Sequence, residues 1–176
     1  MIVTKQTRTI KLLILAAALG YSATSVATSA DFEQDYPIEN TASIEVSNGS
    51  GSVDVRGADV DQVTIRASIS INERYVRRDK YKAKKMALDL RAKPPISVDG
   101  DRIVIEQPKN SAQRRHATIS YEILVPRDAQ VNVQSESGDV RVSGISGPVN
   151  ATSDTGVVTV VRVNPEQTNE VRVAAR

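Results

Sequence analysis

The chain contains no cysteine and no tryptophan, and His116 is its only histidine. Without cysteine it can form no disulfide bond, thiolate metal site, thiol nucleophile or lipid-modified cysteine after a leader segment. One imidazole leaves mainly carboxylates to hold a metal ion, so we expect no zinc site. No G-x-S-x-G elbow accompanies His116, and we interpret this residue as part of a surface loop.

Aromatic residues are also scarce, with one Phe and five Tyr among 176 residues. A core must therefore consist of Val, Ile, Leu and Ala, and the 40% hydrophobic content is sufficient for one domain. β-Branched side chains favour a sheet over a helical bundle. Few rings are present to stack on bases, so we expect no nucleic-acid partner.

Hydrophobic runs are too short to span a bilayer, which needs about 20 residues. The most apolar run, L-L-I-L-A-A-A-L-G at residues 12–20, follows Lys5, Arg8 and Lys11 and precedes the small residues T-S-A that end at Ala30. This order is typical of a secretory signal peptide. We expect residues 1–30 to be a signal peptide cleaved near Ala30, and the mature protein to be periplasmic or extracellular. Retention of the uncharged stretch as an anchor is the alternative.

Alternating hydrophobic residues dominate the rest of the chain. A polar leader at residues 31–41 precedes a single β domain at residues 42–176. Within it, apolar residues recur at every second position, as in half-buried strands. The runs lie at residues 43–47, 52–57, 62–71, 96–98, 102–106 and 118–126.

One segment follows helical spacing instead. Ala83, Met86 and Leu90 lie three, four and seven residues apart, which places them on one helix face. Asp79 can cap the N-terminus of such a helix, and Pro94 lies beyond its end. We predict one short amphipathic helix at residues 79–90.

The most informative pattern is a repeat, which is clearest at residues 131–160. Six residues near the N-terminus recur at a constant offset of 87, and the second copy recurs again at an offset of 18. A final V-R-V at residues 171–173 resembles a degenerate further copy. The first set is Ile44, Val46, Gly51, Val53, Val55 and Gly57, which align with Val131, Val133, Gly138, Val140, Val142 and Gly144. The shorter period aligns Val131, Val133, Ser135, Gly138, Val140 and Val142 with Val149, Ala151, Ser153, Gly156, Val158 and Val160.

Such a repeat cannot bury its inward valines alone. Stacking the copies buries them and lets backbone groups of successive strands pair at a spacing of about 4.8 Å. Glycine suits the corners, so we interpret S-E-S-G-D at residues 135–139 as a turn and not as an active site. We therefore predict an all-β, β-solenoid-like stack of strand repeats with one inserted helix. Its uncovered edge strands would permit self-association.

The residues from V-N-V-Q-S-E-S-G-D-V-R-V-S-G to T-G-V-V-T-V, preceded by G-D-R-I-V-I-E and Y-E-I-L-V-P, resemble the bacterial putative-adhesin family of exported β-strand repeat proteins. The resemblance covers about residues 42–160. It implies a right-handed, solenoid-like stack at the cell envelope, and it brings no catalytic residue with it. This chain is shorter than the longer members of the family, so an extended fibre is not expected.

A basic segment surrounds the predicted helix. Residues 73–93 carry a net charge of +6, whereas removing the positive leader leaves −1 for the whole mature chain. The segment is either the solvated face of an amphipathic helix or a patch for anionic envelope material. The patch would comprise Arg74, Arg77, Arg78, Lys80, Lys82, Lys84 and Lys85.

Several carboxylates occur in turns, but none matches a calcium-binding loop. We interpret them as turn residues and expect no metal and no cofactor. They are Asp59, Asp61, Asp99, Asp101, Asp139 and Asp154.

These patterns favour a non-enzymatic protein of the cell envelope with an adhesin-like binding or scaffolding surface. Its partner would be an envelope protein, a glycan or an anionic lipid surface. One alternative is a sensory or regulatory module for envelope stress that engages a membrane partner through the basic helix. Another is a carbohydrate-active solenoid enzyme, which convergence of Asp99 and Asp101 with a third carboxylate in a cleft would favour.

Overall fold

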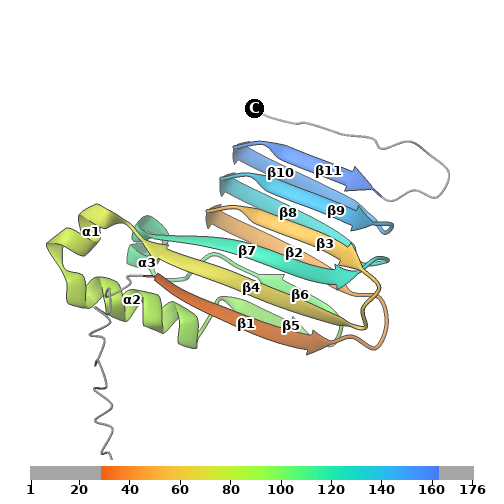
Figure 1. The fold of residues 1–176 in the computed structure, drawn as a ribbon, viewed down its shortest axis with the longest axis horizontal. Helices are drawn as coiled ribbons and strands as arrows, with labels where there is room; N and C mark the ends of the chain where they lie inside the picture. The colour runs from red at the N-terminus through yellow and green to blue at the C-terminus, as the bar shows by residue number, and fades with distance from the viewer. Residues whose placement is uncertain (1–28, 163–176) are drawn as a thin grey trace, which may run out of the picture.

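The computed structural model describes residues 29–162, which form two β-sheets that face one another, with helices near one end (Figure 1). We call the six-stranded sheet, of order β1-β4-β7-β3-β9-β11, sheet A, and the five-stranded sheet, of order β10-β8-β2-β6-β5, sheet B. Sheet A comprises β1 (Ser29–Pro37), β4 (Gln62–Ile71), β7 (Ala117–Pro126), β3 (Val53–Ala58), β9 (Val140–Ile145) and β11 (Val158–Arg162). Sheet B comprises β10 (Val149–Thr155), β8 (Gln130–Ser137), β2 (Ser43–Ser50), β6 (Arg102–Ile105) and β5 (Ile96–Asp99).

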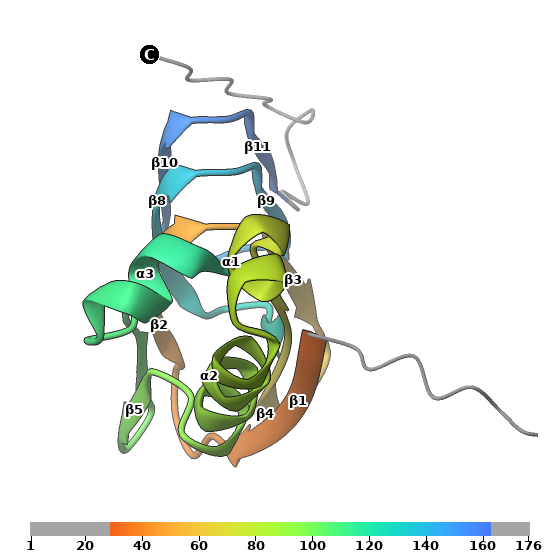
Figure 2. The same ribbon diagram turned by 90° about the vertical axis from the view of Figure 1, so that its left-hand side faces the viewer.

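The sequence repeats form a parallel stack. The strand pairs β2–β3, β8–β9 and β10–β11 each place one strand in each sheet, and we call each pair a rung; Figure 2 shows the three rungs one above another. Val131 lies opposite Ile44 on one side and opposite Val149 on the other. In sheet A, Val142 lies between Val55 and Val160 in the same way. The predicted offsets of 87 and 18 are thus confirmed as cross-strand neighbours.

A solenoid over the whole domain is not confirmed, because both sheets are mixed. The parallel pairing ends at β7 in sheet A and at β6 in sheet B. Beyond these strands β4 pairs antiparallel with both β7 and β1, and β5 pairs antiparallel with β6. Strands joined by short turns or inserted helices reverse direction here, which repeated coils do not. The all-β prediction stands, with a three-rung stack at one end of mixed sheets.

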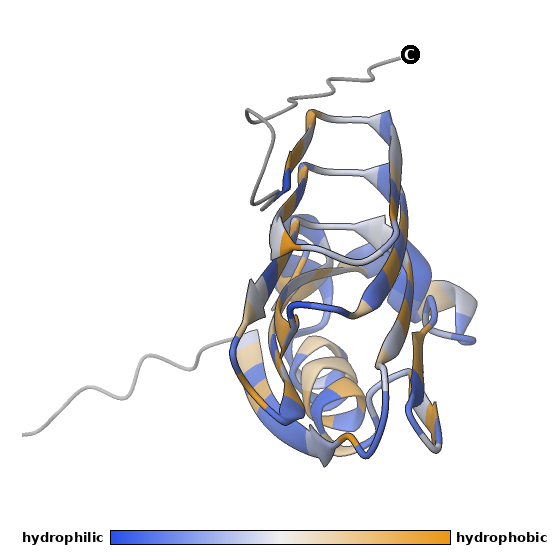
Figure 3. Ribbon diagram, turned by 90° about the vertical axis from the view of Figure 1, so that its right-hand side faces the viewer, coloured by the Kyte–Doolittle hydropathy of each residue, from blue (hydrophilic) through white to orange (hydrophobic). Residues whose placement is uncertain are grey.

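The core fills the space between the two sheets. Hydrophobic and polar residues alternate along the strands, as the bands of Figure 3 show, so most strands bury one side. Val55, Val133 and Val142 are each 0% exposed. The alternation read from the sequence therefore identified the inward faces of most strands; β5 is the exception, since its Val98 is 46% exposed.

Helix α2 (Lys80–Ala92) closes one end of this core. It lies between the two sheets where they splay apart beside β1, β4 and β5 (Figure 2). Its buried residues Ala83, Met86, Ala87 and Leu90 confirm the predicted face, and Asp79 is its N-cap. Two further short helices were not predicted: α1 (Glu73–Arg78) directly before α2, and α3 (Ser111–His116) in the stretch interpreted as a loop.

The polar leader is part of the fold. Residues 31–37 of the predicted leader belong to the nine-residue strand β1 at the edge of sheet A. Phe32 and Tyr36 face the core, and the acidic residues of β1 face outward. Its alternation was missed because Gln34 interrupts the apolar series. Ala30, the predicted cleavage position, is buried and pairs with Ile69. Most of the predicted signal peptide, at residues 1–28, and the V-R-V at residues 171–173 lie outside the described residues.

Candidate functional site

The seven predicted patch residues all lie exposed on α1 and α2. The two helices are separated only by Asp79, which ends α1 and caps α2. Because α2 is held by four buried side chains, its other face is presented to solvent on a fixed support. The structure therefore brings the predicted cations onto one helical layer, which we call the basic face.

Nearby acids neutralise part of the basic face. Arg77 pairs with Glu73 at 3.1 Å, Lys82 with Asp79 at 3.0 Å and Lys85 with Asp89 at 2.7 Å. These are exposed pairs within a helix or across its cap, and each is weak. Arg74, Arg78, Lys80 and Lys84 form no ion pair within residues 29–162. Four of the seven cations thus have no acidic partner in the described part of the chain.

Two large apolar side chains project from the same face. Tyr81 is 79% exposed and Leu88 is 45% exposed. They lie seven residues apart, on the side of α2 opposite its buried residues, with Lys84 and Lys85 between them. Tyr81 and Leu88 were not among the predicted patch residues, although their spacing relative to Ala83 and Leu90 was sufficient to place them outward.

The cap at the start of α2 supplies a test of how the basic face is supported. The pKa of Asp79 is lowered because its carboxylate accepts a hydrogen bond from the backbone N–H of Lys82 and pairs with the Lys82 side chain. A lowered pKa stabilises the fold above the ordinary value of 3.8, and this contribution is lost as the pH falls below it. We expect Asp79→Ala to lower the melting temperature at neutral pH, and the difference from wild type to shrink in acid. Circular dichroism melts would measure both, with Asp79→Asn, which keeps a capping oxygen, as the control; an equal loss at every pH would contradict this account.

His116 is not in a loop. It ends α3, half-buried, and its ring stacks on Tyr75 of α1 at 4.3 Å between centroids with an interplanar angle of 19°. The contact joins α1 to α3, and no serine or carboxylate is hydrogen-bonded to the His116 ring in the described structure. Its geometry is that of a packing residue.

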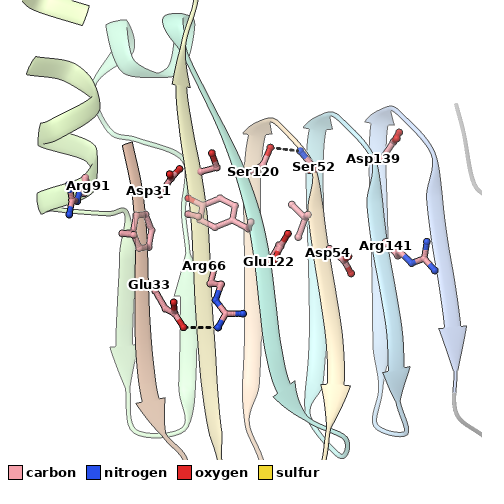
Figure 4. A pocket seen from close by; sticks show the side chains of 15 residues that line it. Asp31, Glu33, Ser52, Asp54, Arg66, Arg91, Ser120, Glu122, Asp139 and Arg141 are labelled. Atoms are coloured by element: carbon pink, nitrogen blue, oxygen red, sulfur yellow. Dashed lines mark hydrogen bonds and ion pairs between the residues drawn. The ribbon is translucent and has the colours of Figure 1, made fainter. Parts of the chain in front are cut away.

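A shallow hollow of about 730 Å³ on the outer face of sheet A is the other candidate site (Figure 4). Charged residues from neighbouring strands meet there in one cross-strand row. Glu33 pairs with Arg66 at 2.8 Å, Arg66 lies opposite Glu122, and Glu122 is next to the strand position of Asp54. The row could not be predicted, because the sequence does not say which strands adjoin.

The hollow offers no recognisable chemistry. Asp54 pairs with Arg56 at 2.6 Å through Oδ2, and its buried Oδ1 has no partner in the described structure. The exposed ion pairs Glu33–Arg66, across two strands, and Asp54–Arg56, within one strand, partly neutralise these charges, and the hollow is lined by no histidine. Within residues 29–162 no group of three or more metal-ligating side chains occurs.

Of the six predicted turn carboxylates, Asp59, Asp101 and Asp139 have structural partners, whereas Asp99 and Asp154 lie in β5 and β10 and not in turns. Asp101 accepts hydrogen bonds from the backbone N–H of Glu39 and the side chain of Asn40, which fixes the connection between β1 and β2. Asp139 accepts from the N–H of Val157 and so links the corners of two rungs. Asp99 and Asp101 belong to no group of three or more acidic or histidine side chains in the described part of the chain.

Comparison with known proteins gives only distant likenesses. No protein-family model and no curated protein matches the chain. It is similar to a crystal structure of a putative cell adhesion protein from Clostridium sporogenes, with 14% identity, a TM-score of 0.45, and coverage of 72% of this chain and 59% of that one. It is also similar to a putative adhesin from Parabacteroides distasonis, with 12% identity, a TM-score of 0.34, and coverage of 76% and 56%. The chain thus spans less than two thirds of either protein.

None of the helices within residues 29–162 is both long enough and apolar enough to cross a lipid bilayer.

Proposed function

We propose that this protein is an exported, non-enzymatic component of the cell envelope that attaches to anionic surfaces through the basic face of α1 and α2. The β-sheets then serve as a binding or scaffolding platform beside that surface. The single observation that supports this proposal best is the exposure of Tyr81 and Leu88 among lysines and arginines.

An ordinary solvated helix does not need that arrangement. Exposed charges alone keep a helix soluble, whereas an exposed ring and an exposed leucine cost free energy in water. At a membrane surface both can enter the boundary between headgroups and acyl chains, while lysines reach back to phosphate groups. The combination is typical of interfacial attachment, and it supports a patch for anionic material over the solvated face of an amphipathic helix.

Charge asymmetry would orient the molecule as it approaches. Residues 73–93 carry +6, so the rest of residues 31–176 carries −7. An anionic surface would attract the helical end and repel the remainder. The four buried side chains of α2 would then hold the basic face flat against the surface, because the helix cannot turn on its support.

The proposal predicts salt-sensitive binding to anionic vesicles. Replacing Lys80, Lys82, Lys84 and Lys85 with Gln is expected to weaken sedimentation with phosphatidylglycerol vesicles by roughly fivefold per charge. Neutral phosphatidylcholine vesicles should bind neither protein. Cosedimentation at rising ionic strength would measure the effect.

Two control variants test whether binding depends on the basic face or only on the net charge of the protein. Replacing Arg66, Arg102, Arg127 and Arg141 with Gln removes the same charge from the sheets and the turn between β7 and β8, and should leave binding nearly unchanged. Replacing Tyr81 and Leu88 with Ser should leave the initial electrostatic attraction but remove binding that persists at higher salt. Equal loss in both charge variants, or binding by none of the proteins, would refute the proposed attachment.

A further inference from the structure

The two ends of the core are closed in different ways. At one end α2 fills the gap between the sheets, whereas the β10–β11 rung ends the stack with no element over it in the described structure (Figures 1 and 2). Val131 and Val142 are buried, but their counterparts Val149 and Val160 on the β10–β11 rung are only half-buried. The β10–β11 rung therefore exposes a surface that every rung beneath it buries.

The edge strands at the two ends of the molecule also differ. β1, at the other edge of sheet A, carries Asp31, Glu33, Asp35 and Pro37, and β5, at the other edge of sheet B, is only four residues long. Charge, proline and shortness are the features that prevent edge strands from pairing. By contrast, residues 149–162 of the β10–β11 rung contain only Asp154 and the terminal Arg162 as charged residues, and no proline. The chain protects two of its four edges and leaves the two edges of one rung open.

We propose that a second copy of this chain docks on the β10–β11 rung and continues both sheets across a two-fold axis. The open rung presents two strands at once, one in each sheet, and each has one edge without a partner in the described structure. A partner that adds a single strand would cover only one of them, whereas another β10–β11 rung has two strands at the same separation. Rotation about an axis perpendicular to the sheets places β10 beside its own image and β11 beside its own image, both antiparallel, as a closed two-fold contact requires.

The contact would continue the interior of the stack. The inward side chains of one copy, which include Val149, Ala151 and Val160, would pack against inward side chains of the other copy and so lengthen the apolar column in which Val142 now lies between Val55 and Val160. The dimer would carry the two basic faces at opposite ends, because α2 lies at the far end of each stack. This inference goes beyond the proposed attachment and does not depend on it.

The decisive measurement is the oligomeric state of the full chain by sedimentation velocity over a wide range of concentrations. Wild type is expected to be a dimer. Thr152→Glu combined with Thr159→Glu places like charges on both open strands, facing their own images, and should raise the dissociation constant by about 100-fold. Thr152 is exposed, and Thr159 lies opposite Arg141, so the fold should tolerate both changes. Thr152→Glu alone should show a smaller effect in the same direction.

A matched control adds the same charge one strand further inside. Gln134→Glu combined with Ser143→Glu changes β8 and β9, which are paired on both sides. This variant should remain dimeric, with a circular dichroism spectrum and melting temperature that show all variants to be folded. A dimer that survives the Thr152 and Thr159 changes, or one that the control also dissociates, would overturn the proposal.

The 14 residues that follow Arg162 are the competing occupant, because they continue directly from the open rung. If Val171 and Val173 supplied the missing strand, wild type would be monomeric, and Val171→Asp combined with Val173→Asp would promote association. A wild type that is monomeric at every concentration overturns the proposal, whatever these variants do. A dimeric wild type that they leave unchanged supports it.

Discussion

Gly138→Ala is expected to lower the free energy of unfolding by about 3 to 5 kcal/mol, or to prevent folding. Gly138 adopts a φ of 126°, where an L side chain is strained. A Cβ atom at this position would also overlap the backbone carbonyl of Gly51 in the adjacent rung. The carbonyl cannot yield, because Gly51 and Gly156 stand at the same corner in the neighbouring rungs and pack against the same column of backbone.

Two other glycines provide graded controls in urea denaturation. Gly100 has a φ of 56° but open space around it, so Gly100→Ala should cost only the strain of a left-handed residue, about 1 kcal/mol. Gly49 has neither a positive φ nor a backbone contact, and Gly49→Ala should be nearly neutral. A loss at Gly138 no larger than the loss at Gly100 would show that the corners are not closely stacked.

Tyr121→Ala should be comparably damaging, at about 3 to 5 kcal/mol. Tyr121 is 2% exposed in β7, between Ala67 of β4 and Val53 of β3. With one Phe, five Tyr and no Trp in the chain, no other aromatic side chain is as deeply buried in the described structure. Its removal leaves a cavity where the parallel and antiparallel parts of sheet A join, and chemical denaturation would measure the loss.

Tyr121→Phe keeps the ring and removes only the hydroxyl, so it measures the contribution of the hydroxyl alone. Burial raises the pKa of Tyr121 above its ordinary value of 10.0, because the phenolate would lose its hydration. A raised pKa means that the stabilisation is fully present below pH 10 and is lost as the pH rises further, since the unfolded chain ionises first. Wild type should therefore lose stability in alkali more steeply than Tyr121→Phe, whereas the two should be similar at neutral pH. Parallel alkaline losses would indicate that this hydroxyl is hydrated in the folded protein.

Local patterns were sufficient wherever a residue's environment depends on its near neighbours. The helix at residues 79–90 was predicted because Ala83, Met86 and Leu90 share a face and Asp79 can cap it, and both features hold. The leader was interpreted as polar because Gln34 and three acids dilute its alternation, yet pairing with β4 makes it a strand. Helix α3 was missed because six residues capped by Asn110 carry no buried face.

The candidate site, too, could be predicted only in part from local patterns. The seven cations were identified from charge alone, since nine positive residues fall within residues 73–93. Helical spacing could also have predicted their acidic partners, which lie three or four residues away. The same spacing places Tyr81 and Leu88 outward, and the patch could have been predicted in full by combining these two residues with the cations. The charged row on sheet A joins residues from four strands, and no local pattern could have assembled it.

The sequence by itself determined the inward faces of most strands, the corner glycines and the mutual alignment of the repeats, because side-chain alternation and a constant offset are properties of the chain. Only the tertiary structure decided that β6 and β7 pair with the repeat at residues 43–57 on the side away from its copy at residues 130–145. It also decided that β4 and β5 turn antiparallel, that α2 closes one end and that β10 and β11 leave the other open. Strand direction and neighbour order depend on which apolar faces can be buried together. Alternative pairings of all the strands compete for this burial, so the outcome depends on the whole chain.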